Sequence, residues 1–295
     1  MALSARSTGL PRVLLDHQQI LAAELDRIVP PADRAPAAVH QSIRYTLLGP
    51  SKRVRGVLTL LVADMFGSGQ QAMAAASAIE LVHASSLILD DLPAMDNTPE
   101  RRGHTANHLK YGEATAILAA VGLLNMAFGH VAFAYEPPLA TALARTLADA
   151  IGTDGLIGGQ ADDLQLRPEP VQLAVLEPID RRKTALLFRA AAAAGAMVGG
   201  AAADEVERLA AFGERLGLAF QIVDDILDTE GDRSAHEAAQ ARRDGRGHAA
   251  WIADVAAARA RAGELRASCG ELLAPFGQRA QPLCELTQFV LERTA

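Results

Sequence analysis

The stretch Leu87-Ile-Leu-Asp-Asp-Leu-Pro-Ala-Met-Asp96 decides how this chain is interpreted, because it places three carboxylates at the end of an apolar segment. A second stretch, Ile222-Val-Asp-Asp-Ile-Leu-Asp228, repeats the arrangement more than a hundred residues later. Two like charges about 4 Å apart repel by about 4 kcal/mol at an effective dielectric of 20, so such clusters need cations. Mg²⁺ combines carboxylate ligands with phosphate oxygens of a substrate. The sequence therefore predicts two acidic walls of one metal-dependent phosphate site.

For either cluster alone, the alternative is an acidic pair on a solvated helix face. Both clusters are flanked by apolar residues and follow one template, which favours the metal site. A third pair, Asp162-Asp163, follows Gly158-Gly-Gln160 but has no third carboxylate at helical spacing. We expect this pair to be solvated, or to support other site residues from behind.

Composition favours helices over sheets. Half of the 295 residues are hydrophobic, only 4% are aromatic, and alanine recurs throughout, whereas strands prefer β-branched and aromatic residues. A chain of 31.0 kDa is long enough for one large domain or two small ones. The net charge of −7 and the pI near 5.6 argue against nucleic acid and anionic membranes as general partners.

The distribution of proline indicates where long helices run. Proline interrupts the chain repeatedly up to Pro178, whereas residues 179–274 contain none. Helical spacing of apolar residues is clear at Leu58, Leu61, Val62 and Met65. No segment alternates long enough to indicate a sheet, and no linker marks a domain boundary. The sequence predicts an all-α protein in which residues 1–295 form a single-domain bundle of long helices.

Two features bear on location. Cys269 and Cys284 have neither metal-binding nor redox spacing, which fits a reduced compartment, and the N-terminus shows no secretory signal. The segment Thr115–Tyr135 is apolar enough to raise the question of a membrane span, but Asn125 and His130 interrupt it. We expect a cytoplasmic protein without stable membrane insertion, in which this segment is an interior helix.

The positive charges form three motifs. Lysine occurs only at positions 52, 110 and 183. Lys52-Arg53-Val-Arg55 follows Gly49-Pro-Ser at an expected helix start, where backbone N–H groups also favour an anion. Lys183-Thr184 opens an apolar helix, and Arg101-Arg102 lies just beyond the first acidic cluster. The alternative for Lys52 to Arg55 is a solvated helix start, and the alternative for Arg101-Arg102 is an exposed pair in a loop. If the basic motifs lie near the aspartate clusters in the fold, one diphosphate would be bound through metal ions and another by cationic side chains alone.

Together these motifs resemble those of the trans-isoprenyl diphosphate synthase (polyprenyl synthetase) family. Residues 80–97, Arg101-Arg-Gly103 and residues 112–118 are similar to its first aspartate-rich region. Gly158-Gly-Gln160, Lys183-Thr184 and residues 220–228 resemble its later motifs, in family order. The resemblance covers residues 40–265 and is closest to the geranylgeranyl diphosphate synthases of bacterial carotenoid-type pathways. Their first cluster also has four residues between its second and third aspartates.

The resemblance implies a prenyltransferase that condenses isopentenyl diphosphate with an allylic diphosphate, head to tail, in a helical bundle around a central apolar cavity. It implies Mg²⁺, about three ions at most, bridging the allylic diphosphate and held by Asp90, Asp91, Asp96, Asp224, Asp225 and Asp228. For isopentenyl diphosphate it implies Lys52, Arg55, His83 and Arg102, with Arg53 as a further candidate. For the allylic diphosphate it implies Arg101 and Lys183. As catalytic side chains beside the reacting atoms it implies Lys183, Thr184 and Gln221.

The resemblance also implies a product length. In the family an aromatic residue at the Ser85 position closes the cavity near C15, so the small Ser85 and Ser86 indicate growth to C20, geranylgeranyl diphosphate. A farnesyl or longer-chain polyprenyl diphosphate synthase is the alternative. Less favoured are a class I terpene cyclase, which needs no second diphosphate site, and a non-catalytic partner subunit, which usually lacks some aspartates. A homodimer is expected from the resemblance alone.

One departure from the family concerns the loop after the second cluster. The family usually carries a further lysine there, whereas residues 231–249 contain none. Arg242, Arg243 or Arg246 is the candidate replacement.

Overall fold

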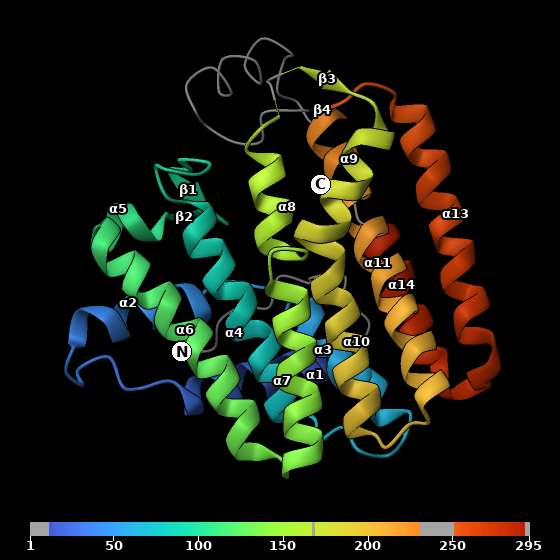
Figure 1. Ribbon diagram of the computed structural model, residues 1–295, viewed down its shortest axis with the longest axis horizontal. Coiled ribbons are helices and arrows are strands. Elements are labelled where there is room, and N and C mark those ends of the chain that lie inside the picture. Colours follow the sequence, from blue (N-terminus) through green and yellow to red (C-terminus); the bar gives the residue numbers. More distant parts are fainter. Residues whose placement is uncertain (1–11, 167–168, 231–250, 293–295) are drawn as a thin grey trace.

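The computed structural model describes residues 12–166, 169–230 and 251–292 (Figure 1). Its elements are almost all helices, which confirms the predicted all-α class. The strands among the described residues are two residues long and pair β1 with β2 and β3 with β4. The site is therefore positioned by helices packed against helices.

In the N-terminal half the elements are α1 (Arg12–Ile28), α2 (Ala37–Leu47), α3 (Val54–Asp64), α4 (Met73–Asp90), β1 (Glu100–Arg101), β2 (His104–Thr105), α5 (Asn107–Tyr111), α6 (Glu113–Ala134) and α7 (Pro137–Ile151). In the C-terminal half they are α8 (Leu156–Asp163), β3 (Pro170–Val171), α9 (Leu173–Asp180), the π-helical turn η1 (Arg181–Ala185), α10 (Leu186–Val198), α11 (Ala203–Glu230), β4 (Trp251–Ile252), α13 (Val255–Leu273), the 3₁₀ segment η2 (Ala274–Ala280) and α14 (Gln281–Leu291).

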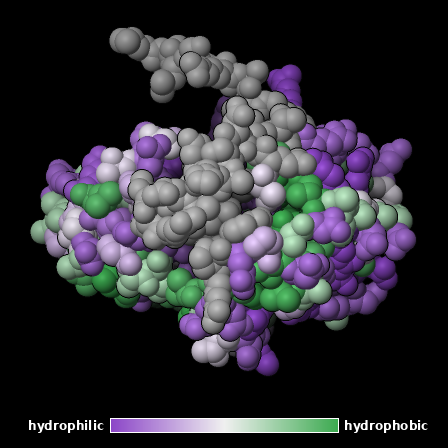
Figure 2. Space-filling view, turned by 90° about the horizontal axis from the view of Figure 1, so that it is seen from above, coloured by the Kyte–Doolittle hydropathy of each residue, from purple (hydrophilic) through white to green (hydrophobic). Residues whose placement is uncertain are grey.

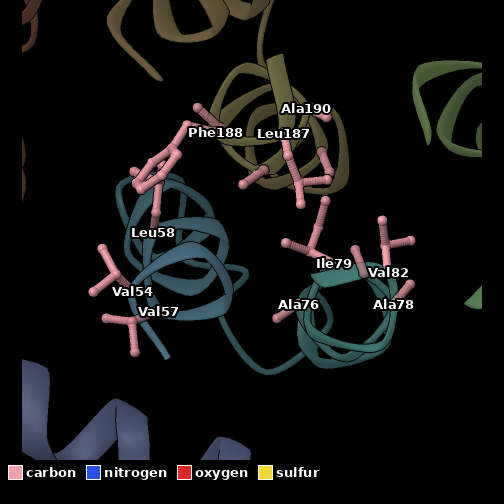
Figure 3. Packing of buried hydrophobic residues seen from close by; sticks show 14 of the residues in the cluster. Val54, Val57, Leu58, Ala76, Ala78, Ile79, Val82, Leu187, Phe188 and Ala190 are labelled. Atoms are coloured by element: carbon pink, nitrogen blue, oxygen red, sulfur yellow. The ribbon is translucent and has the colours of Figure 1, made fainter. Parts of the chain in front are cut away.

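The centre of the bundle is formed by α3, α4, α10 and α11. Helix α10 packs along α3 and α11, and α4 packs along α6. Figure 3 shows Phe188 pointing toward Leu58, and Leu187 pointing toward Ile79. Leu58, Ile79 and Phe188 are fully buried, and burying a side chain of this size contributes about 1.5 to 3 kcal/mol to stability. This core fixes the spacing between the helices that carry the candidate site residues.

Helices α4 and α11 carry the two aspartate clusters at their C-terminal ends. The proline-free region 179–274 contains the 28-residue α11, as predicted. Helix α4 ends at Asp90, three residues before Pro93, since a proline cannot continue the hydrogen-bonded helix. The C-terminus of a helix carries partial negative charge, so an aspartate there adds to an existing negative potential. Both clusters therefore lie where cations are most needed.

Helix α6 contradicts one expectation. Its buried residues form a single stripe: Ala116, Ala119, Ala120, Leu123, Ala127 and Val131. On its other side Ile117, Leu118 and Val121 are 43%, 59% and 56% exposed. The prediction of an interior helix is therefore wrong for this chain by itself, because α4 and its neighbours cover only one face of α6.

Two of the described helices are long and apolar enough to cross a membrane, judged by length and composition. They are α4 and α6. In the most apolar stretch of each, 61% of α4 but only 33% of α6 is buried. Burial inside the protein explains the apolar composition of α4. Most of the apolar surface of α6, by contrast, is exposed in the single chain.

Candidate active site

A cavity of about 1070 Å³ lies between α3, α4, α8, α9, η1, α10 and α11. Its lining combines leucine and phenylalanine side chains with carboxylates from both aspartate clusters and with cations from the basic motifs. Sites for small molecules are typically concave and apolar with a few placed polar groups, and their volumes reach about 1000 Å³. Viewed from above relative to Figure 1, the surface mixes hydrophilic and hydrophobic residues (Figure 2). The cavity therefore has the size and the chemistry of a site for a ligand with a charged head and an apolar tail.

Four of the predicted acidic residues line this one cavity. They are Asp90, Asp96, Asp224 and Asp225, from α4 and its following loop and from α11. The loop after α4 folds back on itself, since the Asp96 amide donates to the carbonyl of Asp90 at 3.0 Å. The tertiary structure thus brings both clusters to one space, as predicted.

The carboxylates fit metal ions that take their remaining ligands from a substrate. Among the described residues no three side chains of His, Cys, Asp or Glu lie close enough to enclose an ion by themselves. Asp90 Oδ1 is nevertheless buried without a hydrogen-bond partner, while its neighbour Oδ2 accepts from Arg101 at 3.1 Å. Lys183 Nζ lies 3.6 Å from Oδ1, outside hydrogen-bond distance, and a buried carboxylate oxygen without a hydrogen bond is a candidate cation ligand.

Asp91 does not line the cavity with the other aspartates, and its role as a metal ligand stays a prediction. It is 3% exposed and accepts from Arg101 Nε at 2.7 Å. Burial raises the pKa of Asp91, although Arg101 opposes that shift. The physical reason is helical: adjacent residues project about 100° apart, so Asp91 faces β1 when Asp90 faces the cavity. Of Asp228 only the backbone, in α11, is described.

Lys183 lies among carboxylates in the π-helical turn η1. Its Nζ is 2.6 Å from Asp163 Oδ2 and 3.6 Å from Asp90 Oδ1. Burial by itself would lower the pKa of Lys183, but Asp90 and Asp163 outweigh it and raise the pKa above its usual value. The side chain is therefore a fixed positive charge beside the first acidic cluster. Asp163, from the third pair, supports it from behind.

The glycine motif of α8 lets this helix approach η1 closely. A Cβ atom on Gly159 would lie 2.3 Å from the backbone nitrogen of Lys183, so only glycine fits without a shift of the backbone. Gln160, the next residue, lines the cavity, and its Nε2 is buried without a hydrogen-bond partner. The motif thus sets the position of Lys183 and presents a donor to the cavity.

Thr184 and Gln221 form a short hydrogen-bonded chain along the cavity wall. Thr184 Oγ1 donates to Gln221 Oε1 at 3.0 Å, and Gln221 Nε2 donates to Asp225 Oδ1 at 2.8 Å. The hydrogen bonds fix the orientation of both side chains. They therefore aim polar oxygen atoms from η1 and α11 at the cavity shared by the two acidic clusters.

The predicted cationic residues also line the cavity. They are Lys52, Arg55 and Arg102, together with His83. Arg55 Nη1 is 3.3 Å from His83 Nε2, and its guanidinium lies over the ring of Phe188 at 4.5 Å. Burial first, and then Arg55 and Arg102, hold the pKa of His83 well below its usual value. His83 is therefore neutral near pH 7 and accepts a hydrogen bond from Arg55.

Arg53 also lines the cavity, but its guanidinium is paired within the protein. Its guanidinium is buried, with Nη1 3.4 Å from Glu80 Oε2 and Nη2 donating to the carbonyl of Leu47. The ion pair with Glu80 offsets the positive charge of Arg53 that would otherwise attract a diphosphate. A contact of Arg53 with isopentenyl diphosphate stays a prediction, and in this structure Arg53 pairs with Glu80 and binds the end of α2.

Arg101 is tied to the first acidic cluster. Its Nη2 lies 2.6 Å from Asp91 and 3.1 Å from Asp90. Burial alone would lower the pKa of Arg101, and the two aspartates raise it instead. The predicted contact of Arg101 with an allylic diphosphate stays a prediction, and in this structure Arg101 fixes the end of α4.

The two predicted chain-length residues lie on different faces of α4. Ser86 lines the cavity and donates to the carbonyl of His83 at 2.9 Å. Ser85 is 3% exposed and donates to the carbonyl of Ala120 in α6 at 2.8 Å. The expectation that both serines share the cavity face is wrong here for Ser85, because consecutive helical residues diverge by about 100°.

The candidate replacements for the lysine that the family usually carries after the second cluster, Arg242, Arg243 and Arg246, lie outside the described residues.

Sequence reasoning quotes the motifs that contain Glu80 and Gln160 but assigns no role to either of these cavity residues. The signal for Glu80 is a lone acidic residue within the apolar run 74–82. A charge in such a helix must be paired if it is buried, and Glu80 is 1% exposed.

The comparisons with known proteins agree with this geometry. The family model described as polyprenyl synthetase matches residues 36–261. The large subunit 1 of a heterodimeric geranylgeranyl pyrophosphate synthase of Arabidopsis thaliana is 43% identical over 224 residues, 73% of this chain and 60% of that protein. Geranylgeranyl pyrophosphate synthase 7 of the same plant is 40% identical over 239 residues, 77% of this chain and 69% of its own length.

Two solved structures share the fold. An FPP/GFPP synthase from Zymomonas mobilis has a TM-score of 0.81 and 30% identity, covering 94% of this chain and 98% of its own. A geranylgeranyl pyrophosphate synthetase from Geoglobus acetivorans has a TM-score of 0.82 and 26% identity, covering 96% and 100%. With the family model spanning most of the chain and both aspartate clusters on one cavity, this chain belongs to the polyprenyl synthetase family.

Proposed function

We propose that this protein is a Mg²⁺-dependent trans-prenyltransferase that condenses isopentenyl diphosphate with an allylic diphosphate, with geranylgeranyl diphosphate as its main product. The observation that carries the proposal is the lining of one cavity by both acidic clusters and by the cationic residues Lys52, Arg55 and Arg102. A terpene cyclase would need only the acidic side, and a subunit without activity would not need both.

The residues divide the work between two diphosphates. Lys52, Arg55 and Arg102 hold isopentenyl diphosphate by charge alone. Asp90, Asp96, Asp224 and Asp225 would hold Mg²⁺, which would supply positive charge to the departing diphosphate of the allylic substrate. Lys183 adds a fixed positive charge on the same side, because Asp90 and Asp163 keep it protonated.

The reaction then follows from charge separation in an apolar cavity. The allylic C–O bond breaks, and its electron pair leaves with the diphosphate, so an allylic carbocation remains. The double bond of isopentenyl diphosphate supplies the electrons of the new C–C bond. A proton then leaves the product to restore an alkene, and the released diphosphate accepts it. The oxygen atoms of Thr184 and Gln221, fixed by their hydrogen bonds, stabilise the positive charge electrostatically.

Support for a C20 product comes from Ser86 and from relatives. The Arabidopsis thaliana proteins are named geranylgeranyl pyrophosphate synthases, whereas the Zymomonas mobilis structure is named an FPP/GFPP synthase. Ser86 is small and adds little bulk to the cavity wall. Farnesyl and longer polyprenyl diphosphates are the competing products.

The decisive experiment incubates the purified full chain with isopentenyl diphosphate, Mg²⁺ and a C5, C10 or C15 allylic diphosphate, and sizes the dephosphorylated alcohols by chromatography. We expect C20 alcohol, and none when the metal is chelated. Hydrocarbons formed from the allylic diphosphate alone would indicate a cyclase instead. No product with any starter, in a folded sample, would overturn the proposal.

We further propose that the protein is a homodimer that buries the outer face of α6. Ile117, Leu118 and Val121 form an exposed apolar row on this helix, and a contiguous apolar patch of this kind is typical of an interface. A second copy of the chain would offer the same face, as two-fold symmetry requires. One relative is named as a subunit of a heterodimer, so a different partner subunit is the competing outcome.

A further inference from the structure

The turn between α2 and α3, which carries Lys52, has an uncommon backbone conformation. Arg53 precedes α3 with a φ of 52°, in the left-handed region, and no side chain of its own caps the helix. A non-glycine residue keeps this conformation only where its surroundings hold it. The first amides of α3 also need acceptors, as at every helix start. The turn must therefore be stabilised from elsewhere in the fold.

The missing acceptor is Glu80, from the neighbouring helix α4. Glu80 Oε1 accepts from the backbone amide of Gly56 in the first turn of α3 at 2.9 Å. Its other oxygen, Oε2, lies 3.4 Å from Arg53 Nη1. One carboxylate thus binds the start of α3 through its backbone and the preceding turn through a side chain.

Arg53 extends this connection to the end of α2. Its Nη2 donates to the carbonyl of Leu47, the last residue of α2, and to the carbonyl of Gly49 at 3.5 Å. Cations are favoured at helix C-termini, where the carbonyl groups have no helical partners. Glu80 and Arg53 are 1% and 6% exposed, so the pair is buried in the wall of the cavity.

The geometry requires α3 and α4 to lie close together at this point. A Cβ atom on Gly56 would lie 2.9 Å from Glu80 Cγ and 3.2 Å from the carbonyl oxygen of Ala76. Any larger residue would push Glu80 away from the amide that it accepts from. Gly56 and Glu80 therefore act as a matched pair.

Two further side chains hold the same turn. Gln18 Nε2 donates to the carbonyl of Ser51 at 2.7 Å, and Arg102 Nη1 donates to the carbonyl of Pro50 at 3.2 Å. Glu80 also precedes His83 by one helical turn on α4, and His83 is the partner of Arg55. One face of α4 thus contacts the turn with Lys52 and the arginine that follows it.

We propose that Glu80 is a positioning residue for isopentenyl diphosphate. It holds the turn of residues 49–53 and the first turn of α3 so that Lys52 and Arg55 face the cavity, and it does so through Arg53 and the Gly56 amide. The inference rests on the proposed function, because it assigns Lys52 and Arg55 to this substrate. Glu80 lines the cavity as well, but its two carboxylate oxygens bind Arg53 and the Gly56 amide, so we assign it a positioning role.

The test is Glu80→Gln in the full chain with Mg²⁺, since glutamine preserves shape and removes the charge that Arg53 needs. We expect KM for isopentenyl diphosphate to rise about ten-fold or more, with KM for the allylic diphosphate within about two-fold of wild type. Equal changes in both KM values, or an unchanged KM for isopentenyl diphosphate, would overturn the inference.

Glu214→Gln is the matched control. Glu214 is also a buried carboxylate paired with arginine, at 2.6 Å from Arg181 and 3.3 Å from Arg189, and it does not line the cavity. We expect it to lower the thermal midpoint as Glu80→Gln does, while KM for isopentenyl diphosphate stays within about two-fold. A rise equal to that of Glu80→Gln would show that stability alone controls KM, against the inference.

The double variant Arg53→Gln/Glu80→Gln separates positioning from stability. It removes the unpaired buried charge, so the thermal midpoint should recover relative to Glu80→Gln. KM for isopentenyl diphosphate should stay raised, because the bonds to Leu47 and Gly49 are lost. Recovery of KM together with stability would refute a positioning role.

A failure of the proposed function would look different. In that case the wild-type chain itself would form no prenyl product. Calorimetric binding of isopentenyl diphosphate in the absence of an allylic substrate would then compare wild type with Glu80→Gln directly. Weaker binding in the variant supports the inference, and equal or absent binding in both proteins overturns it.

Discussion

At the level of single residues, Asp224 provides the sharpest test of the acidic site. It lines the cavity from α11, whereas the first acidic cluster begins at the end of α4. We expect Asp224→Ala to lower turnover at saturating Mg²⁺ by about a thousand-fold, since a metal-held charge contributes several kcal/mol to transition-state stabilisation. Initial rates measure the effect, and circular dichroism checks the fold.

The control for this variant is Asp204→Ala, in the exposed first turn of the same helix. It removes an equal charge from α11 at a distance from the cavity. Its turnover should match wild type. A near-wild-type rate for Asp224→Ala would remove Asp224 from the metal site.

His83 predicts a pH dependence of stability. Burial and nearby arginines lower its pKa well below 6.5 in the folded chain, whereas the unfolded chain keeps a value near 6.5. The unfolded state therefore binds the extra proton first, so the contribution of His83 is fully present above about pH 6.5 and is lost as the pH falls below it. His83→Gln should flatten this part of the profile.

Thermal midpoints of wild type and His83→Gln between about pH 5 and 7.5 measure the difference in slope. The pKa of His130 is also lowered by burial, so some slope should remain in both proteins. Parallel profiles for the two proteins would show that His83 titrates normally in the folded chain.

At the scale of helices, the register of α4 decides which serine meets the growing chain. Ser86 lines the cavity, while Ser85 is bonded to α6. We expect Ser86→Phe to shift the main product from C20 toward C15, because the added ring fills space beside Leu87 and Leu89. Chromatography of the dephosphorylated products measures the shift.

Ser85→Phe is the companion variant. The resemblance to the family predicts a C15 product for it as well. The fully buried site at the contact with Ala120 adds an overpacking cost of about 1 to 3 kcal/mol, so its thermal midpoint should fall below that of Ser86→Phe. Unchanged product lengths in both variants would remove α4 as the floor of the cavity.

At the scale of the whole molecule, the exposed face of α6 predicts the oligomeric state. Leu118→Glu places a charge in the centre of the apolar row and should convert the proposed dimer to a monomer. Light scattering coupled to size-exclusion chromatography measures the mass. Val175→Glu, on α9, is the control, because Val175 is 50% exposed outside this row. A wild-type chain that is monomeric at micromolar concentration would contradict the dimer.

The sequence by itself determined the helical class, the two aspartate clusters and the cationic motifs, because helical spacing and proline placement are local properties. It also placed Lys183 and Thr184 at the start of an apolar helix, and the structure brings them to the cavity. Local spacing shows which residues share a face of one helix. It does not show which partner that face meets.

Only the tertiary structure decided the remaining assignments. It directed Arg53 to Glu80, Asp91 to Arg101 and Ser85 to α6, and it left the outer face of α6 uncovered. Each of these outcomes depends on contacts between different elements of the fold, which local spacing does not reveal. A charge is assigned to a substrate or to a neighbour only when the folded chain shows whether a partner lies within reach.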